Sequence, residues 1–142
     1  MLENQIRDFI TIDTSRFPIV LVTYQGFVPT WDEYHRAHTA IEMLVANRNN
    51  FVIILDFSQI QTGLSSEYRV AAARWASKTE PLFIKQNVKV AFYTPSVLTR
   101  IVMKGSLVLA PLRYPYTLAP TLEKAYAWAA KQLQQSQRPE GI

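Results

Sequence analysis

Two kinds of apolar pattern alternate along the chain. Short runs rich in β-branched and aromatic residues are typical of strands, and longer segments with apolar residues three or four positions apart are typical of helices. The strands are expected at residues 6–12, 19–24, 51–57, 88–93 and 114–118. The helices are expected from Thr30 to the polar run at 47–50, from Ser65 toward Pro81, from Thr94 to about Ala110, and from Pro120 to about residue 133.

Several of these helix boundaries carry their own signals. Thr30 with Glu33 three positions later is a capping box. Thr94 followed by Pro95 predicts an N-cap and a proline at the first helical position. Pro81 is expected to break or bend the second helix, because proline has no N–H to donate.

The order of elements, β-β-α-β-α-β-α-β-α, predicts an α/β fold with a mixed five-stranded sheet and four helices. Strands that alternate with helices form a mostly parallel sheet, and the first two strands are close enough for an antiparallel hairpin. The run at 51–57 is apolar on both faces, as in a central strand. No repeat or linker divides the sequence, so we expect one domain over residues 1–142, with its core at 6–133 and a frayed tail at 134–142.

The third helix is more apolar than a surface helix requires, since such helices usually bury a band only about 100° wide. One stripe contains Val97, Leu98, Ile101, Val102, Gly105, Val108 and Leu109. Met103, Leu107 and Ala110 lie beyond it. Either other elements cover the excess, or the helix presents apolar surface to a partner. We expect a homodimer whose contact includes Leu98, Ile101 and Val102, with Met103 and Leu107 as its main contact residues.

Composition supports a globular domain and removes several kinds of chemistry. Apolar residues make up 49% of the chain, and there is no cysteine, which excludes disulfides, thiolate metal sites and cysteine nucleophiles. Residues 1–56 carry four basic and seven acidic residues, a net charge of −3, whereas residues 57–142 carry eleven and four, a net charge of +7. This basic second half is either a solvated surface or a surface for an anionic partner.

Catalytic and cofactor motifs are missing from the sequence. His35 and His38, with Asp32 and Glu42 nearby, are the only candidates for a metal site or an imidazole base, and packed histidines are the simpler interpretation. There is no Gly-x-Ser-x-Gly elbow, Gly-x-Gly-x-x-Gly or Walker-type loop. Basic residues of the second helix lack a nucleic-acid-binding motif. We therefore expect no enzyme activity, metal, cofactor or nucleic-acid partner.

No targeting or spanning segment is visible. The first residues lack the basic and then apolar pattern of a signal peptide. The longest apolar-rich stretch, at 97–112, is interrupted by Arg100 and Lys104 and is too short to span a bilayer. The lack of such segments and the absence of cysteine together favour a cytoplasmic protein.

Three stretches resemble a known bacterial family. They are the Thr-Trp-Asp-Glu-Tyr helix start within 27–34, the Ile-Ile-Leu-Asp-Phe-Ser run at 53–58, and the Leu-Glu-Lys-Ala-Tyr-Ala-Trp-Ala helix at 122–129. Together with the order of elements, they resemble STAS domains, and most of all the SpoIIAA-like, or STAS/SEC14-like, family. The resemblance covers about residues 6–133 and implies a SpoIIAA-like fold.

The same resemblance singles out one serine. Regulatory STAS proteins carry an Asp-Ser-Ser-Gly-like run at the start of the second helix, where the first serine accepts a phosphate. The matching run here is Leu64-Ser65-Ser66-Glu67, so Ser65 falls on the phosphoacceptor position, although the acidic residue and the glycine are replaced. The alternative is that Ser65 and Ser66 only cap the helix.

Three hypotheses about function follow. The first is a non-enzymatic regulatory or binding module that acts through protein–protein contacts, including contacts with itself. The second is a carrier of a small apolar or lipid-like ligand, held between the third helix and the sheet. The third is an enzyme that uses His35 or His38.

Overall fold

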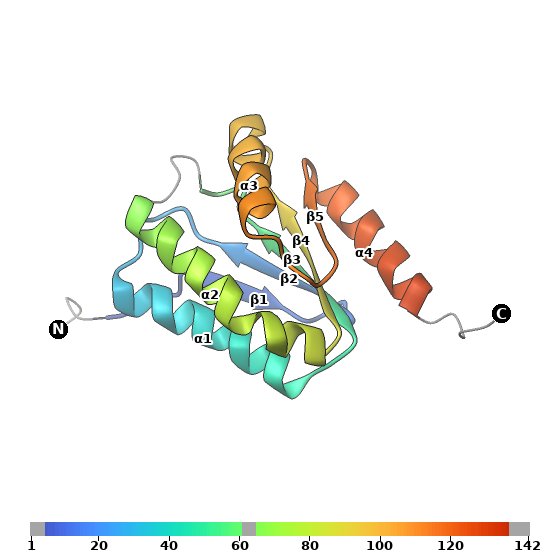
Figure 1. Cartoon of the computed structure of the whole chain (residues 1–142). Helices are drawn as coiled ribbons and strands as arrows, with labels where there is room; N and C mark the ends of the chain where they lie inside the picture. The colour runs from blue at the N-terminus through green and yellow to red at the C-terminus, as the bar shows by residue number, and fades with distance from the viewer. Residues whose placement is uncertain (1–4, 61–64, 137–142) are drawn as a thin grey trace.

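The computed structural model describes residues 5–60 and 65–136 as a five-stranded sheet with four helices (Figure 1). The elements are β1 (Ile10–Asp13), β2 (Ile19–Tyr24), α1 (Trp31–Asn47), β3 (Phe51–Asp56), α2 (Ser66–Lys85), β4 (Val88–Tyr93), α3 (Val97–Leu109), β5 (Tyr116–Ala119) and α4 (Leu122–Ser136). The strands lie in the order β1-β2-β3-β4-β5. β1 and β2 are antiparallel and all other neighbours are parallel. The predicted fold class and element order are confirmed.

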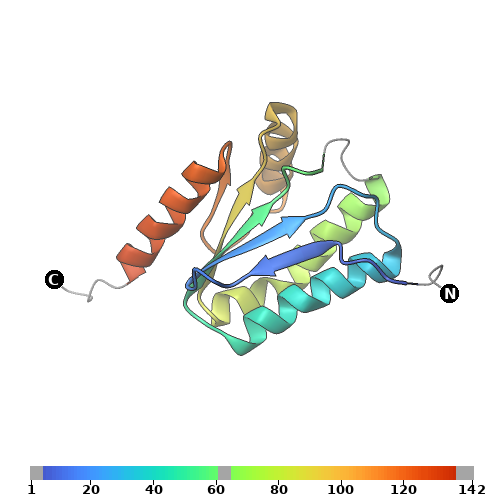
Figure 2. The same cartoon turned by 180° about the vertical axis from the view of Figure 1, so that it is seen from behind.

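Helices cover both faces of the sheet. α1 and α2 lie on one face and α4 lies on the other, as the views from the front and from behind show (Figures 1 and 2). The larger core, between the sheet and α1–α2, includes Val20, Ile41 and Ile53, and the smaller core beneath α4 includes Ile54 and Ala125. Successive residues of β3 therefore enter opposite cores, which explains why this strand is apolar throughout.

The first strand is shorter than the expected 6–12 segment. Only Ile10–Asp13 pair with β2, at the edge of the sheet. Ile6 and Ile12 are exposed, whereas Phe9 is buried against Tyr24 and Phe27. The apolar spacing of residues 6, 10 and 12 thus predicted the strand but not the aromatic residue that anchors it.

Pro81 does not end α2, which continues to Lys85. The prediction of a break there was wrong because packing outweighs the missing hydrogen bond. Phe83 follows the proline and is buried against Trp75 and Tyr114. This burial holds the last turn of the helix in place.

The boundaries of α3 and α4 differ by up to three residues from their expected positions. Ser96, rather than Thr94, is the N-cap of α3, since its hydroxyl accepts from the Thr99 N–H. The Thr94 hydroxyl accepts from the Ser96 N–H instead, and the Thr94 N–H donates to the Ala119 carbonyl. α4 begins at Leu122, after a Thr121 hydroxyl that accepts from the Lys124 N–H. The same helix extends to Ser136, past the expected start of the tail, and residues 137–142 lie outside the described residues.

Candidate functional site

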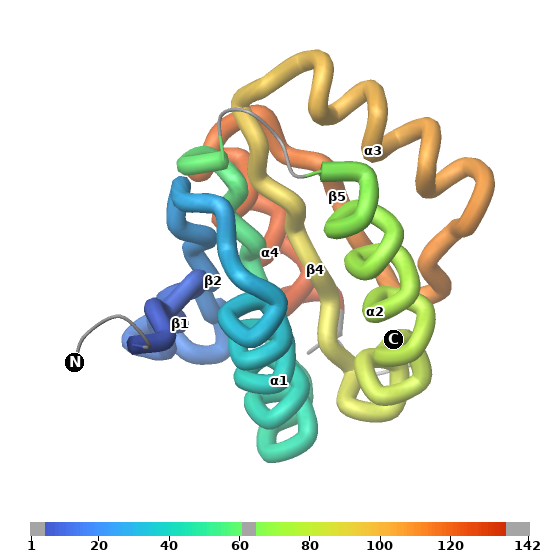
Figure 3. The backbone as a smooth tube through the Cα atoms, turned by 90° about the vertical axis from the view of Figure 1, so that its left-hand side faces the viewer, coloured from blue at the N-terminus to red at the C-terminus, as the bar shows by residue number. Residues whose placement is uncertain are grey.

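α3 stands apart from the body of the domain, beyond the ends of the central strands (Figure 3). None of its residues is buried. Its exposed apolar side chains are Val97, Leu98, Ile101, Val102, Val108 and Leu109. These residues belong to the apolar stripe noted in the sequence, and this stripe is exposed rather than covered by the other described elements.

Met103 and Leu107 lie on a different side of α3 from Leu98 and Leu109. Both are half-buried, and both line a groove between α3 and α2 with a volume of about 400 Å³. The expectation placed them at the centre of a contact between two copies of the chain. Their position in the groove instead makes them candidates for contact with a small ligand.

Four segments of the chain form the walls and floor of this groove. Ala72 and Ala76, one turn apart on α2, form one wall and leave space because their side chains are small. Phe57 and Phe92 form the floor, with stacked rings whose centroids are 6.4 Å apart. Most of the other lining residues come from α3 and from the segment that follows it, at 110–112. Phe57 directly follows β3, so the groove lies beyond the carboxyl ends of the parallel strands, where open α/β sheets bind ligands.

Within residues 5–60 and 65–136, two charged side chains line the groove. Glu80 is bound by Arg113, whose Nε lies 2.7 Å from the carboxylate and whose backbone N–H also donates to it. These hydrogen bonds hold the pKa of Glu80 below its usual range. Arg69 is exposed, and within the described residues its guanidinium has no hydrogen bond or ion pair.

A second hollow, of about 510 Å³, lies on the other side of α3, against β5. Its lining includes Arg100, Lys104 and the strongly exposed Ile101 and Val108. Because these apolar side chains remain largely in water, this hollow is an open surface depression. The groove beside α2 offers more half-buried apolar contacts to a small molecule.

Ser65 lies at the exposed start of α2, as expected. Its hydroxyl oxygen accepts from the Tyr68 N–H at 3.4 Å, so it caps the helix. Leu64, which replaces the acidic residue of the STAS motif, lies outside the described residues. Exposure leaves the hydroxyl accessible to a kinase, and phosphorylation of Ser65 stays a prediction.

The two histidines of α1 have separate surroundings. His38 is buried, and its Nδ1 donates to the Tyr34 carbonyl oxygen at 2.9 Å, since a carbonyl can only accept. Burial lowers the pKa of His38 below its usual range, which favours the neutral ring. His35 is exposed and stacks on Trp31. Neither ring lines the groove.

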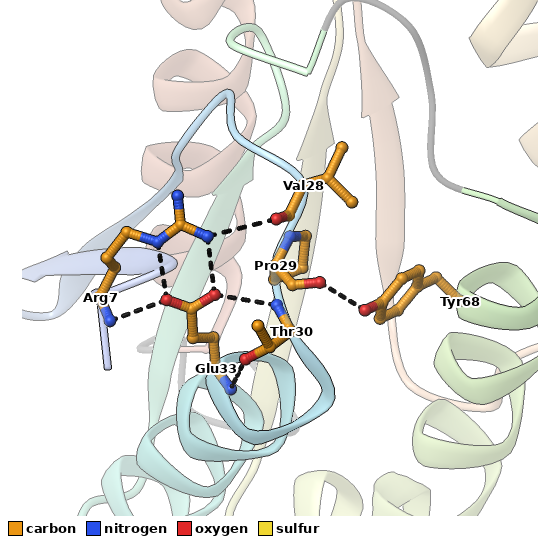
Figure 4. A network of polar contacts seen from close by, with 6 residues as sticks. All are labelled: Arg7, Val28, Pro29, Thr30, Glu33 and Tyr68. Atoms are coloured by element: carbon orange, nitrogen blue, oxygen red, sulfur yellow. Dashed lines mark hydrogen bonds and ion pairs between the residues drawn. The ribbon is translucent and has the colours of Figure 1, made fainter. Parts of the chain in front are cut away.

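The predicted capping box at the start of α1 is present and extends into a larger network (Figure 4). The Glu33 carboxylate accepts from the Thr30 N–H and from the side chain and backbone of Arg7. These interactions, the Arg7 side-chain hydrogen bond above all, lower the pKa of Glu33 to about 2. The network fixes the residues before β1 against the start of α1.

We expect Glu33→Gln to lower the melting temperature at pH 7 by a few degrees, because the neutral amide loses the charged interaction with Arg7. The folded-state pKa is depressed, so the carboxylate stabilises the fold above its usual range and loses that effect as pH falls from about 4.5 toward 2. The difference in melting temperature between wild type and variant should therefore shrink as the pH is lowered over that interval. Glu67→Gln, which removes an exposed carboxylate from the first turn of α2, is the control. A difference that stays constant down to pH 2 would contradict the prediction.

Two further observations concern the described residues only. In the ranges 5–60 and 65–136, no three His, Cys, Asp or Glu side chains are grouped closely enough to hold a metal ion. None of the helices in this part of the chain is long and apolar enough to cross a membrane.

The sequence suggested a ligand between the third helix and the sheet, but not the wall that α2 contributes or the two charged residues on it. Arg69 was noted only as one of several basic residues of α2, and the pair of Glu80 and Arg113 was not anticipated. One signal was present in the sequence. Ala72 and Ala76 were expected on the inward face of the second helix, and two small residues one turn apart leave space beside the helix.

Comparison with known proteins identifies the fold. No protein-family model matches the chain, and no curated protein matches it. A solved structure of an uncharacterised protein from Shewanella loihica PV-4, of the DUF3478 family with a SpoIIAA-like fold, is similar with a TM-score of 0.62. The alignment covers 91% of this chain and 98% of that one at 16% sequence identity. The chain therefore has the SpoIIAA-like fold that the sequence resemblance implies.

Proposed function

We propose that this SpoIIAA-like domain is a non-enzymatic binding module of the cytoplasm, and that it holds a small apolar ligand in the groove between α2 and α3. The observation that carries the proposal is the groove itself, lined by the half-buried side chains of Phe57, Phe92, Met103 and Leu107. Its volume of about 400 Å³ lies within the range of roughly 300–1,000 Å³ typical of small-molecule sites.

The arrangement of the lining supports binding rather than catalysis. A ligand that covers the apolar surface of such a groove removes it from water, and this burial contributes roughly 25 cal/mol per Å² to the free energy of binding. The imidazoles of His35 and His38, the usual acid–base groups near neutral pH, lie on α1 outside the lining. Among the residues that the structure describes, the groove thus offers contact area and one unpaired cation, without an imidazole beside it.

A second candidate function is protein–protein contact, including a homodimer, through the outward side of α3. Leu98 and Leu109 are 72% and 88% exposed, and neither lines the hollows beside the helix. A Cβ added at Gly105, on the same side, would meet nothing within 4 Å. Exposed leucines on one side of a helix favour a partner of this kind.

Native mass spectrometry of freshly purified protein tests the two functions together. A retained small molecule on a chain of 16.3 kDa supports the carrier, and twice that mass supports self-association. Titration of the purified protein with decanol, monitored by calorimetry, then tests the groove directly. If decanol does not bind and no molecule is retained, the carrier function is wrong.

Ala76→Phe should reduce decanol affinity by at least about tenfold, because the larger side chain fills the groove beside Phe57 and Phe92. Calorimetric titration of the folded variant measures the effect. Val70→Phe is the matched control, since Val70 is half-exposed on the same helix and lines a separate surface hollow. Equal losses in the two variants would argue against the groove as the site.

A further inference from the structure

Among its described lining residues, the groove has one charge without a partner, and that charge is positive. Arg69 and Glu80 lie at the two ends of the α2 wall, eleven residues or roughly 16 Å apart along the helix. Arg113 already neutralises Glu80. The Arg69 guanidinium is unpaired within the described residues, so one end of an otherwise apolar groove is cationic.

We propose that the occupant of the groove is a linear apolar molecule with a carboxylate at one end, and that Arg69 binds this carboxylate. The inference rests on the proposed carrier function and adds the chemical class of the ligand. The alkyl chain lies over Phe57 and Phe92 and against Met103 and Leu107, and the charged end lies at the start of α2.

A carboxylate matches this end of the groove better than a phosphate does. The planar guanidinium of Arg69 donates two parallel hydrogen bonds to a carboxylate, and the single positive charge balances a single negative charge. A phosphate monoester carries a charge of roughly −1.5 to −2 near neutral pH and favours a second cation. The nearest candidates on α3, Arg100 and Lys104, line the hollow on the other side of that helix.

The structure also supplies a matched control for Arg69. Arg74 lies five residues further along α2, is also exposed, and lines a separate surface hollow with Trp31 and Val70. Replacing either arginine by glutamine removes one positive charge from the same helix. Only Arg69→Gln removes it from the groove.

The test is a calorimetric titration of wild type, Arg69→Gln and Arg74→Gln with decanoate and with decanol, which share a chain length and differ in the end group. Wild type should bind decanoate more tightly than decanol. Arg69→Gln should lower decanoate affinity by about five- to tenfold and leave decanol affinity unchanged, because only the contact with the charged end is lost. Arg74→Gln should change neither affinity.

Each contrary outcome has a distinct meaning. If Arg69→Gln lowers the affinity for both molecules equally, or for neither, the assignment of the carboxylate to Arg69 is overturned while the carrier function stands. Decyl phosphate that binds wild type more tightly than decanoate overturns the choice of a singly charged end group. If wild type binds neither decanoate nor decanol, the proposed carrier function fails as well.

Discussion

Phe83→Ala should lower the free energy of unfolding by about 3–4 kcal/mol, the usual cost of truncating a buried phenylalanine. Phe83 is only 3% exposed, and its ring packs edge-on against Trp75 and stacks on Tyr114. For a domain of this size, such a loss lowers the melting temperature by roughly 10 °C. Urea unfolding followed by circular dichroism measures the change.

The neighbouring residue provides the control for this prediction. Ile84 follows Phe83 on the same helical turn but is 44% exposed, so Ile84→Ala should cost about 1 kcal/mol or less. A loss below about 1 kcal/mol in Phe83→Ala would contradict the role given to this residue. In that case, the continuation of α2 past Pro81 would need another explanation.

Pro81 and Thr94 show where sequence signals are outweighed by tertiary structure. Both residues have strong local preferences, proline for ending a helix and threonine for capping one. The structure follows neither preference: Phe83 is buried beyond the proline, and Thr94 is held ahead of the helix, with its N–H bound by the neighbouring strand and its hydroxyl bound to the Ser96 N–H. The partners that decide these boundaries lie far away in the sequence.

Elements with a single apolar face were predicted well. Tyr34, His38 and Ile41 recur at helical spacing in the first helix and are buried, and the capping box expected at Thr30 is present. The central strand β3 follows equally from its apolar run, because it is covered on both faces. One apolar face per helix and two per central strand leave little freedom in how the elements pack.

α3 shows the converse case. Its sequence is apolar on most sides, so helical periodicity does not indicate which side faces the sheet. Met103 and Leu107 line the groove, and their contact with a second copy of the chain stays a prediction, whereas Leu98 and Leu109 lie outside the groove. Which side of α3 lies toward α2 depends on how the segments before and after it join the sheet, and periodicity carries no information about that.

The full lining of the groove could not be predicted from the sequence, and the reason is geometric. Its lining comes from the end of β3, the middle of α2, β4, α3 and the segment that follows α3. Periodicity within one element says which residues share a face, but not which faces of different elements meet. Arg69 and Arg74 look equivalent in the sequence, and only the structure places one of them in the groove.

Lysine pairs on two sides of α3 are expected to have different effects on the binding of a small ligand. Met103→Lys with Leu107→Lys should weaken binding of decanol by roughly 100-fold, because two charges would enter the apolar groove. Leu98→Lys with Leu109→Lys should leave that affinity unchanged, because these side chains lie outside both hollows. If the protein forms a homodimer through the outward side of α3, this second pair should convert it to a monomer of 16.3 kDa in sedimentation experiments.

Both pairs add the same charge to the same helix, so a general effect of charge or of helix stability should appear in both. Circular dichroism first establishes that each variant retains its helix content. A variant pair at Met103 and Leu107 that disrupts a dimer but retains decanol binding would place the contact between copies in the groove. Loss of decanol binding in that pair alone places the ligand there, with Leu98 and Leu109 free to contact a protein partner at the same time.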